Sequence, residues 1–246
     1  MTDNANIAII TGASQGIGHA TAKLFLSRGW QVISCARSRP AEDLSAIKGW
    51  LGHIEADLTE NASLDAFIKE ATGLLNGRAL NALVNNAGMS PKSQNRERLG
   101  ALNGDLDAWR TVFELNFFAP LKLGRGFASP LAKAHGSIVN VTSIAGHMIH
   151  PFAGSAYSSS KAALSALTRE MANEFAAINV RVNAVAPGEI STEMIQPEYE
   201  MLIPRIPLNR MGTPEDVARS IYFLSSSEAD YVTGTEIWVT GGQHMF

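Results

Sequence analysis

Residues 7–18 read Ile7-Ala8-Ile9-Ile10-Thr11-Gly12-Ala13-Ser14-Gln15-Gly16-Ile17-Gly18, an apolar run that passes straight into a glycine-rich turn. The apolar run predicts a buried strand at Ile7–Thr11, and the periodicity after it predicts a helix at Gly16–Arg28. Glycines at such a junction permit a tight turn and let backbone approach a pyrophosphate, to which the helix N-terminus offers N–H groups. The spacing G-x-x-x-G-x-G is one residue off the commonest dinucleotide fingerprint, so an ordinary strand-to-helix turn stays the alternative.

The rest of the chain repeats this alternation of apolar runs and helical patterns. Further strands are predicted at Gln31–Ala36, Gly52–Asp57, Ala82–Asn85, Ser137–Ser143, Val180–Ala186 and Glu236–Thr240. Further helices are predicted at Ala62–Leu75, Leu106–Phe127, Ala156–Ala177 and Pro214–Ser225. Apolar strands interleaved with helices indicate a parallel sheet covered on both faces. We therefore expect an α/β fold, a Rossmann-type doubly wound parallel β-sheet of about seven strands flanked by helices on both faces. Residues 1–246 should form one domain.

Composition excludes several classes of protein. Of the 246 residues, 46% are hydrophobic and 17% charged, and the net charge is −3, which gives no electrostatic footprint for nucleic acid. No run approaches the ~20 apolar residues of a membrane helix, and the N-terminus has no signal-like segment. Cys35 is the only cysteine, so neither an intrachain disulfide nor a cysteine-based metal cluster can form. We expect a cytoplasmic protein that binds neither nucleic acid nor membrane.

Acid/base chemistry is indicated by Tyr157 and Lys161, which lie one helical turn apart on one face of a predicted helix. A nearby cation lowers the pKa of a phenol, which makes Tyr157 a usable proton donor or acceptor. Ser143 ends a predicted strand and could hold a substrate oxygen beside Tyr157. Asn116 lies four residues before Pro120, where we expect a kinked helix with exposed backbone groups. The alternative for Tyr157 and Lys161 is a half-buried aromatic and a solvated lysine.

The end of the second predicted strand bears on cofactor choice. In doubly wound folds an acidic residue there binds the ribose hydroxyls of NAD, whereas an arginine accommodates the 2′-phosphate of NADP. This chain has Arg37 and Arg39 there and no Asp or Glu. NADP(H) is therefore favoured over NAD(H), unless both arginines are merely solvated.

Two irregular stretches flank the predicted site. Met89–Asp105 is polar and is typical of a surface loop or of a short helix with loop flanks. Glu189–Leu208 contains three prolines together with apolar residues, and we expect it to form a lid that closes over the site. Four side chains are expected to line the substrate pocket: His147, His150, Phe152 and Met194. The two histidines have no carboxylate or cysteine near them in sequence, so no metal site is predicted.

Taken together these residues resemble the short-chain dehydrogenase/reductase family, in its compact single-domain branch. The likeness runs almost end to end. It rests on Thr11-Gly12-x-x-x-Gly16-x-Gly18, Asp57-Leu58, Asn85-Asn86-Ala87-Gly88, Asn116, Ser143, Tyr157-x-x-x-Lys161 and Pro187-Gly188-x-Ile190-x-Thr192. Each motif alone is weak, whereas the ordered set is highly specific.

The resemblance implies a role for each matched residue. Tyr157 would be the catalytic acid/base, Lys161 would lower its pKa and hold the nicotinamide ribose, and Ser143 would orient the substrate oxygen. Asn116 would hold a water that links Lys161 to solvent. The cofactor would be bound by Gly12, Ser14, Gln15, Gly16, Ile17, Gly18, Arg37, Asp57, Leu58, Asn86, Ala87, Gly88, Tyr157, Lys161, Pro187, Gly188, Ile190 and Thr192.

The implied activity is an NAD(P)(H)-dependent oxidoreductase that interconverts a small-molecule carbonyl, ketone or aldehyde, and an alcohol. Members of this branch are usually homotetramers or homodimers, so the same assembly is expected. Two alternatives stay open. One is a 3-oxoacyl-thioester (acyl carrier protein) reductase, and the other is a non-catalytic cofactor-sensing protein. A sensor needs no acid/base pair, so Tyr157 and Lys161 argue against it.

Overall fold

The computed structural model describes residues 5–40, 42–92, 98–192 and 197–245. Met194, predicted to line the substrate pocket, lies outside the described residues. The strands are β1 (Ile7–Thr11), β2 (Gln31–Ala36), β3 (Trp50–Glu55), β4 (Ala82–Asn85), β5 (Ser137–Val141), β6 (Arg181–Pro187) and β7 (Glu236–Val239). The α-helices are α1 (Gly16–Ser27), α2 (Asn61–Leu75), α3 (Leu106–Phe113), α4 (Ala119–Gly126), α5 (Ala128–Ala134), α6 (Ser155–Ala176) and α7 (Pro214–Ser225).

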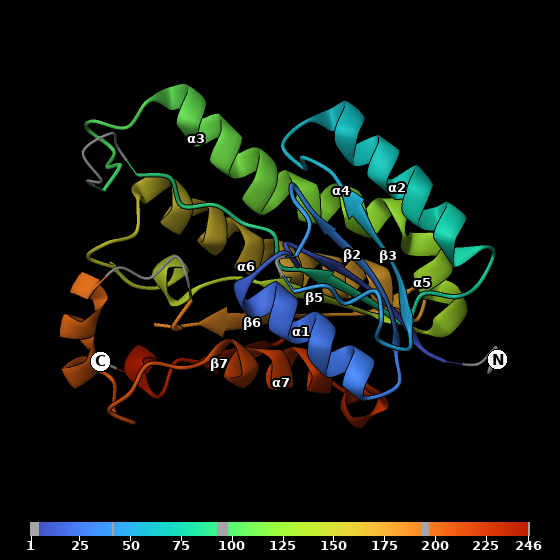
Figure 1. The fold of residues 1–246 in the computed structure, drawn as a ribbon. Coiled ribbons are helices and arrows are strands. Elements are labelled where there is room, and N and C mark those ends of the chain that lie inside the picture. Colours follow the sequence, from blue (N-terminus) through green and yellow to red (C-terminus); the bar gives the residue numbers. More distant parts are fainter. Residues whose placement is uncertain (1–4, 41, 93–97, 193–196, 246) are drawn as a thin grey trace.

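The seven strands form one parallel sheet in the order β3-β2-β1-β4-β5-β6-β7 (Figure 1). The chain leaves β1 in one direction toward β2 and β3 and later returns to the other side of β1 with β4. A doubly wound sheet binds ligands outside the carboxyl ends of its strands at this reversal. The predicted fold class is confirmed, and the topology places a site beyond the carboxyl ends of β1 and β4.

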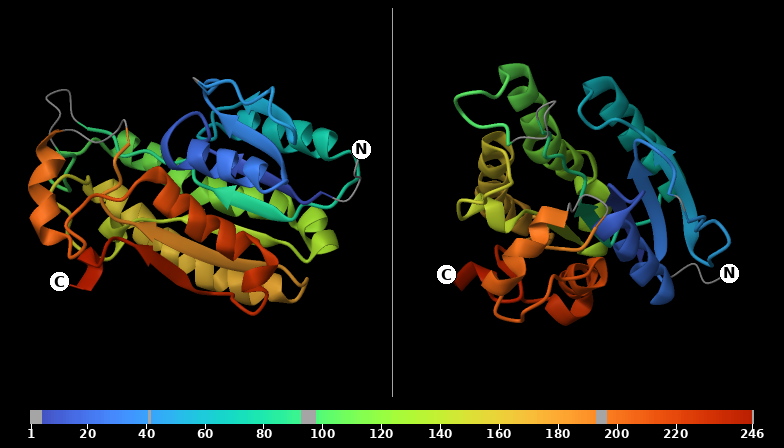
Figure 2. Two further views of the ribbon diagram at one scale, coloured as in Figure 1. Left: turned by 60° about the horizontal axis from the view of Figure 1, so that its bottom comes forward. Right: turned by 60° about the vertical axis from the view of Figure 1, so that its left-hand side comes forward.

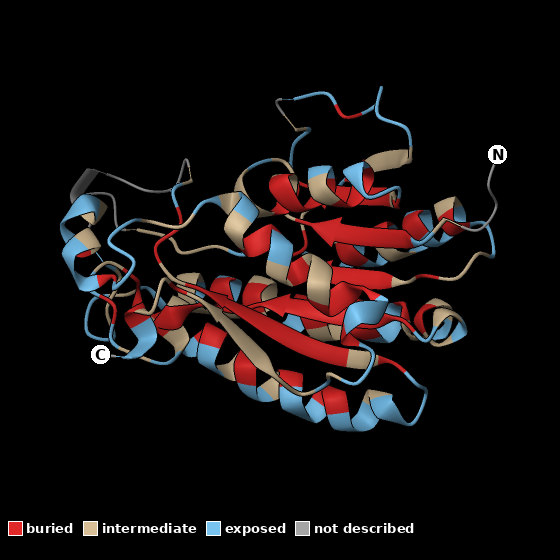
Figure 3. Ribbon diagram, turned by 90° about the horizontal axis from the view of Figure 1, so that it is seen from below, coloured by how far each residue is buried: buried red, intermediate tan, exposed pale blue. Residues whose placement is uncertain are grey.

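Two apolar cores cover the two faces of the sheet. Helices α1 and α7 pack on one face, where Phe25, Trp30 and Tyr222 meet edge to face at centroid distances of 4.9 to 6.0 Å. Helices α2, α4, α5 and α6 cover the other face, around Phe67 and Phe127. Figure 3 shows buried strands between helices that are buried on one side and exposed on the other. The sheet is therefore covered on both faces, which suits a scaffold for precisely placed side chains.

Several predicted elements differ from the structure, five of them by no more than one residue at either end: α1, α2, α6, β6 and β7. β3 is Trp50–Glu55 rather than Gly52–Asp57: its pairing with β2 begins at Trp50 and ends at Glu55, with a register shift between Val32 and Ile33. β5 ends at Val141, since Ser143 already caps a 3₁₀ turn at Ile144–Gly146. Helix α5 was not predicted.

The single kinked helix predicted at Leu106–Phe127 is α3, a π-helical turn at Glu114–Phe118, and then α4. The irregularity expected near Asn116 is thus confirmed. π-Helical turns are rare and are frequent at functional sites. Asn116 lies inside this turn and is fully buried.

Segments after the strands gather at one end of the molecule. The C-terminus and the 3₁₀ helix Pro197–Arg205, drawn in orange, lie at the end of the sheet opposite the N-terminus (Figures 1 and 2). In the part of the chain that the structure describes, no helix is both long and apolar enough to cross a membrane.

Candidate active site

The glycine-rich turn between β1 and α1 is braced from β4. The side-chain amide of Asn86 donates to the carbonyl oxygens of Thr11 and Gly12, at 3.0 Å each. Gly12 has a φ of +66°, and a Cβ on Gly18 would lie 2.2 Å from the Gly12 carbonyl oxygen. Larger residues would therefore break the turn. Gln15 at the helix N-cap makes no side-chain capping bond, so the first backbone N–H groups of α1 remain available to a phosphate.

A cavity of about 350 Å³ begins at this turn and extends past the carboxyl ends of β5 and β6. Most of the predicted site residues line it: Gly12, Gln15, Gly16, Ile17, Arg37, Asn86, Ala87, Gly88, Ser143, His150, Tyr157, Lys161, Pro187, Gly188, Ile190 and Thr192. The two sides of the cavity approach each other closely, since a Cβ on Gly16 would be 3.4 Å from Cγ2 of Thr192. The predicted residues that the structure places outside its lining are Ser14, Gly18, Asp57, Leu58, Asn116, His147 and Phe152.

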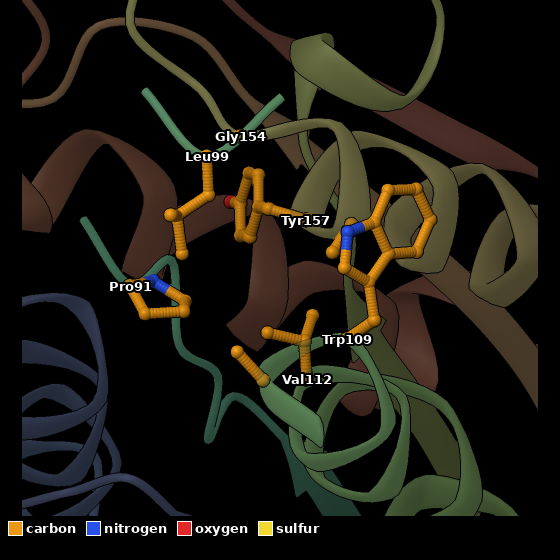
Figure 4. A pocket seen from close by; sticks show the side chains of 8 residues that line it. Pro91, Leu99, Trp109, Val112, Gly154 and Tyr157 are labelled. Atoms are coloured by element: carbon orange, nitrogen blue, oxygen red, sulfur yellow. The ribbon is translucent and has the colours of Figure 1, made fainter. Parts of the chain in front are cut away.

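The phenol of Tyr157 lies between this cavity and an apolar bed. Figure 4 shows its ring among Pro91, Leu99, Trp109 and Val112, which come from the segment after β4 and from α3. Its hydroxyl is hydrogen-bonded to the hydroxyl of Ser143, whose Oγ also accepts from the Ala145 amide at 3.1 Å. The two hydroxyl groups are thus held together at the cavity wall.

The pKa of Tyr157 corrects one prediction. We expected Lys161 to lower it, whereas in the structure it is raised above 10.0. Burial is the main cause, the hydrogen bond from Ser143 acts in the opposite direction, and the charge of Glu189 raises it further. Lys161 Nζ lies 5.8 Å from the ring centroid of Tyr157 and donates to the Val141 carbonyl at 2.7 Å.

Lys161 is itself buried, 3% exposed, and burial lowers its pKa from 10.5 to about 8. It approaches the Gly88 backbone closely, because a Cβ on Gly88 would lie 3.3 Å from both Lys161 Nζ and Asn116 Oδ1. A glycine at this position therefore leaves room for the ammonium group beside the cavity.

The side chain of Asn116 does not line the cavity but is hydrogen-bonded to the backbone of Met89. Its Oδ1 accepts from the Met89 amide at 3.0 Å, and its Nδ2 donates to the Met89 carbonyl at 3.1 Å and to Ser160 Oγ at 3.0 Å. These bonds join the π-helical turn to α6 and to the segment after β4. Asn116 therefore fixes the spacing between Gly88 and Lys161.

The adenine side of the predicted site lies at the ends of β2 and β3. Arg37 lines the cavity, while Arg39 pairs with Glu55 at 3.2 Å on the surface. Asp57 follows β3 and accepts from the amide and the hydroxyl of Thr59, which hold the pKa of its carboxyl below the usual range. The sequence could not show which of the two arginines would face the cofactor. In the structure Arg37 lies at the cavity and Arg39 does not.

The two histidines of the predicted pocket have different partners. His150 Nε2 lies 2.7 Å from Glu189 Oε1 in the cavity wall. His147 turns away and pairs with Glu236 at 2.9 Å, with its ring 4.5 Å from that of Trp238. Phe152 stands behind the wall and packs on Tyr199 at 4.6 Å, and Tyr199 lines the cavity.

Several lining residues were not singled out from the sequence: Met89, Ser90, Lys92, Thr142, Glu189 and Tyr199. Of these, Glu189 and Tyr199 lie in the segment Glu189–Leu208, which is expected to close over the site. Glu189 carried a readable signal, because it directly follows the Pro187-Gly188 pair at the carboxyl end of a strand. In the described residues no group of three or more His, Cys, Asp or Glu side chains is arranged to hold a metal ion.

A family model described as Enoyl-(Acyl carrier protein) reductase matches residues 12–244. The crystal structure of a Brucella ovis oxidoreductase of the short-chain dehydrogenase/reductase family, in complex with a partially ordered NAD, is 44% identical. It has a TM-score of 0.81, and the match covers 96% of this chain and 99% of that one. The chain belongs to the short-chain dehydrogenase/reductase family.

Curated relatives agree with this assignment. Protein FixR of Bradyrhizobium diazoefficiens is 51% identical over 241 residues, which is 97% of this chain and 87% of the relative. The 3-oxoacyl-(acyl-carrier-protein) reductase FabG of Vibrio cholerae is 34% identical over 253 residues and is matched over 100% of both chains. This short-chain dehydrogenase/reductase is accordingly an oxidoreductase that interconverts a carbonyl and an alcohol with a nicotinamide cofactor.

Proposed function

We propose that this protein is an NADP(H)-preferring dehydrogenase/reductase of small carbonyl and alcohol compounds, with Tyr157 as its acid/base. One observation carries the proposal: the hydrogen-bonded Tyr157 and Ser143 lie in the same cavity wall as Lys161, and the cavity leads to the N-terminus of α1. A hydride donor and a proton donor must both reach the same carbonyl group. The proton donor Tyr157 lies in the wall of the cavity that would hold the nicotinamide, so both groups can reach a carbonyl bound there.

The chain's own groups would act as follows. The bound nicotinamide supplies or accepts the hydride. The hydroxyl of Ser143 holds the substrate oxygen, and Tyr157 donates its proton to that oxygen during reduction or accepts it during oxidation. The raised pKa means that Tyr157 holds its proton near neutral pH, as reduction requires, although the buried phenol is a weaker acid than a free tyrosine. Lys161 and Asn116 hold the Gly88 backbone and the ammonium in place, and the apolar bed keeps water from the ring.

The preference for NADP(H) is supported by Arg37. Its position in the cavity lining after β2, without a carboxylate at that strand end, suits a 2′-phosphate better than the two hydroxyls of an NAD ribose. The related Brucella ovis structure contains NAD. Kinetics with both cofactors therefore provide a direct test of this part of the proposal.

The substrate is proposed to be a small carbonyl or alcohol rather than a thioester on a carrier. The reductase FabG is a relative at 34% identity, which keeps the thioester as the second candidate. The buried Glu189 and His150 in the wall beside Tyr157 suit a polar small molecule better than an acyl chain. A cofactor sensor is disfavoured because it would have no use for the Tyr157–Ser143 pair.

We further propose that the enzyme works as a homotetramer or homodimer in the cytoplasm. Large apolar side chains are exposed on the outer helices, among them Leu106 at 66% and Phe118 at 39%. Contact with a second copy would remove them from water. Light scattering coupled to size-exclusion chromatography tests the assembly, and a monomer at micromolar concentration would contradict it.

The decisive experiment for the activity is a panel of ketones, aldehydes, secondary alcohols and one acetoacetyl thioester, followed by the absorbance of the reduced cofactor. NAD and NADP are used in separate series. Turnover of small alcohols with NADP supports the proposal. Turnover of the thioester alone supports the second candidate, and binding of cofactor without any turnover supports a sensor.

A further inference from the structure

The cavity wall contains a buried carboxylate that the proposed acid/base chemistry does not use. Glu189 is 5% exposed and lines the cavity beside Tyr157. Its Oε1 accepts from His150 Nε2 at 2.7 Å and from Gln243 Nε2 at 3.3 Å. Both of these hydrogen bonds end on Oε1 rather than on Oε2. The effect of its charge on the pKa of Tyr157 places it within electrostatic reach of that phenol.

His150 does not neutralise this carboxylate. Its Nδ1 accepts from the backbone amides of Phe152 at 3.2 Å and Ala153 at 3.1 Å, so Nδ1 carries a lone pair and no proton. The network therefore assigns the ring hydrogen to Nε2, which donates it to Glu189. The pair is a neutral imidazole on a carboxylate, and these hydrogen bonds use Oε1 and not Oε2.

Such a group is costly unless a donor reaches it. Oε2 is not one of the fully buried atoms without a partner, so water in the cavity can reach it in the free enzyme, but a substrate that displaces this water without offering a donor leaves the charge unpaired. Here the cavity itself opens beside the carboxylate, so a donor on the substrate can take that place. An acyl thioester has no donor close to its reacting carbonyl and would leave Oε2 unpaired.

We propose that Glu189 selects substrates that carry a hydrogen-bond donor, a hydroxyl or an ammonium group, on the carbon next to the reacting carbonyl or alcohol carbon. The inference rests on the proposed function and names its substrate class: vicinal diols, hydroxyketones and amino alcohols. His150 and Gln243 are positioning residues that aim the carboxylate. Ser143 and Tyr157 act on the reacting oxygen, and Glu189 acts on its neighbour.

The test compares trans-1,2-cyclohexanediol and trans-2-aminocyclohexanol with cyclohexanol, which has the same ring and no second donor. The wild-type enzyme should show a higher kcat/KM for one or both donor-bearing alcohols. The variant Glu189→Gln keeps the shape and removes the charged acceptor. It should lower the ratio of kcat/KM for those alcohols to kcat/KM for cyclohexanol by about 10- to 100-fold, because a hydrogen bond to a charged group is lost only with the former. The effect of the Glu189 charge on the pKa of Tyr157 acts on all three alcohols and cancels in this ratio.

Glu170→Gln is the matched control, because Glu170 is an exposed glutamate in α6 that does not line the cavity. It should leave every ratio unchanged. A loss with the diol identifies a hydroxyl, a loss with the amino alcohol identifies an ammonium group, and either supports the inference. Equal loss on all three alcohols, or none, overturns it. If Glu189→Gln does not fold, the wild-type ratios alone decide, and the absence of any preference for a second donor overturns the inference.

Failure of the proposed function would look different. If the wild-type enzyme turns over no alcohol with either cofactor, calorimetric titration of the same three compounds into the NADP-saturated protein replaces the kinetics. Tighter binding of a donor-bearing alcohol that is lost in Glu189→Gln supports the Glu189 inference even though the proposed activity has failed. Equal binding of all three by both proteins overturns it.

Discussion

The Nζ atom of Lys161 donates a 2.7 Å hydrogen bond to the carbonyl oxygen of Val141, the last residue of β5. This bond ties the middle of α6 to the carboxyl end of the strand that precedes Ser143. The ammonium is consequently directed at backbone, 5.8 Å from the centroid of the Tyr157 ring. The lysine is therefore built into the wall of the site, and its burial has a cost that a pH titration can measure.

The first prediction concerns stability at alkaline pH. Burial lowers the pKa of Lys161 from 10.5 to about 8, so between these values the unfolded chain binds more protons and stability rises with pH. Cys35 opposes this, since burial raises its pKa from 9.0 to about 12 and stability falls over that range. The variant Lys161→Met loses the pH dependence of stability that comes from Lys161 and keeps the one that comes from Cys35.

The difference in free energy of unfolding, wild type minus Lys161→Met, should therefore increase by about 3 kcal/mol from pH 8 to 10.5. Urea denaturation at several pH values measures it. A difference that does not change with pH would show that Lys161 titrates in the folded protein as it does in the unfolded chain.

The second prediction concerns the cofactor. Arg37→Asp places a carboxylate where the 2′-phosphate is proposed to lie, so it should repel NADP and offer a hydrogen bond to the ribose of NAD. The ratio of kcat/KM for NADP to that for NAD should fall by at least 10-fold, since the charge reversal lowers kcat/KM for NADP and raises kcat/KM for NAD. Arg39→Asp is the control, because Arg39 faces Glu55 at the surface. A wild-type enzyme that already prefers NAD contradicts the assignment.

The third prediction concerns Asn116. Asn116→Ala removes three hydrogen bonds and leaves the Met89 amide and carbonyl without their partner. The free energy of unfolding should drop by about 1–3 kcal/mol. Turnover should drop as well, because Gly88 and Lys161 lose their spacing. Denaturation and cofactor-linked kinetics measure the two effects. Asn6→Ala, at an exposed position, should change neither, and an active, fully stable Asn116→Ala would refute the structural role.

The fourth prediction concerns the segment expected to act as a lid. Its 3₁₀ helix, Pro197–Arg205, has Leu202 buried and Tyr199 in the cavity lining. Amides of 197–205 should exchange with deuterium faster than those of β1, and should slow when NADP is added. Mass spectrometry of the exchanged peptides measures this. Equal protection with and without NADP would indicate a helix packed permanently on the core.

Local patterns were sufficient for most of the fold. The apolar run at Ile7–Thr11 and the glycines after it depend on neighbouring residues only, and the structure confirms both the strand and the turn. The irregular helix at Asn116 was also predictable, because a poor helix former stands close before Pro120. Helix α5 was missed because it follows α4 almost without interruption at Phe127.

The site was predictable only where its residues form motifs. Tyr157 and Lys161 lie one turn apart in any helix, so their association could be inferred. The hydrogen bond between His150 and Glu189 joins the segments that follow β5 and β6. These two strands are neighbours in the sheet, which no local sequence pattern reveals. No local pattern reveals the partner of His147 either, because this histidine pairs with Glu236 of β7, which is distant in the sequence. The direction of the Tyr157 pKa depends on burial, which tertiary packing determines.

The central claim is that the Tyr157 hydroxyl transfers the proton, and its most direct test is cofactor-linked turnover of Tyr157→Phe. The ring and its apolar bed stay in place, so NADP binding, followed by fluorescence, should be unchanged. Turnover should fall by about 10²- to 10⁴-fold, the usual contribution of a general acid or base. Tyr231→Phe, at a fully exposed tyrosine, should turn over like wild type. Near wild-type turnover by Tyr157→Phe, with NADP bound, would contradict the account.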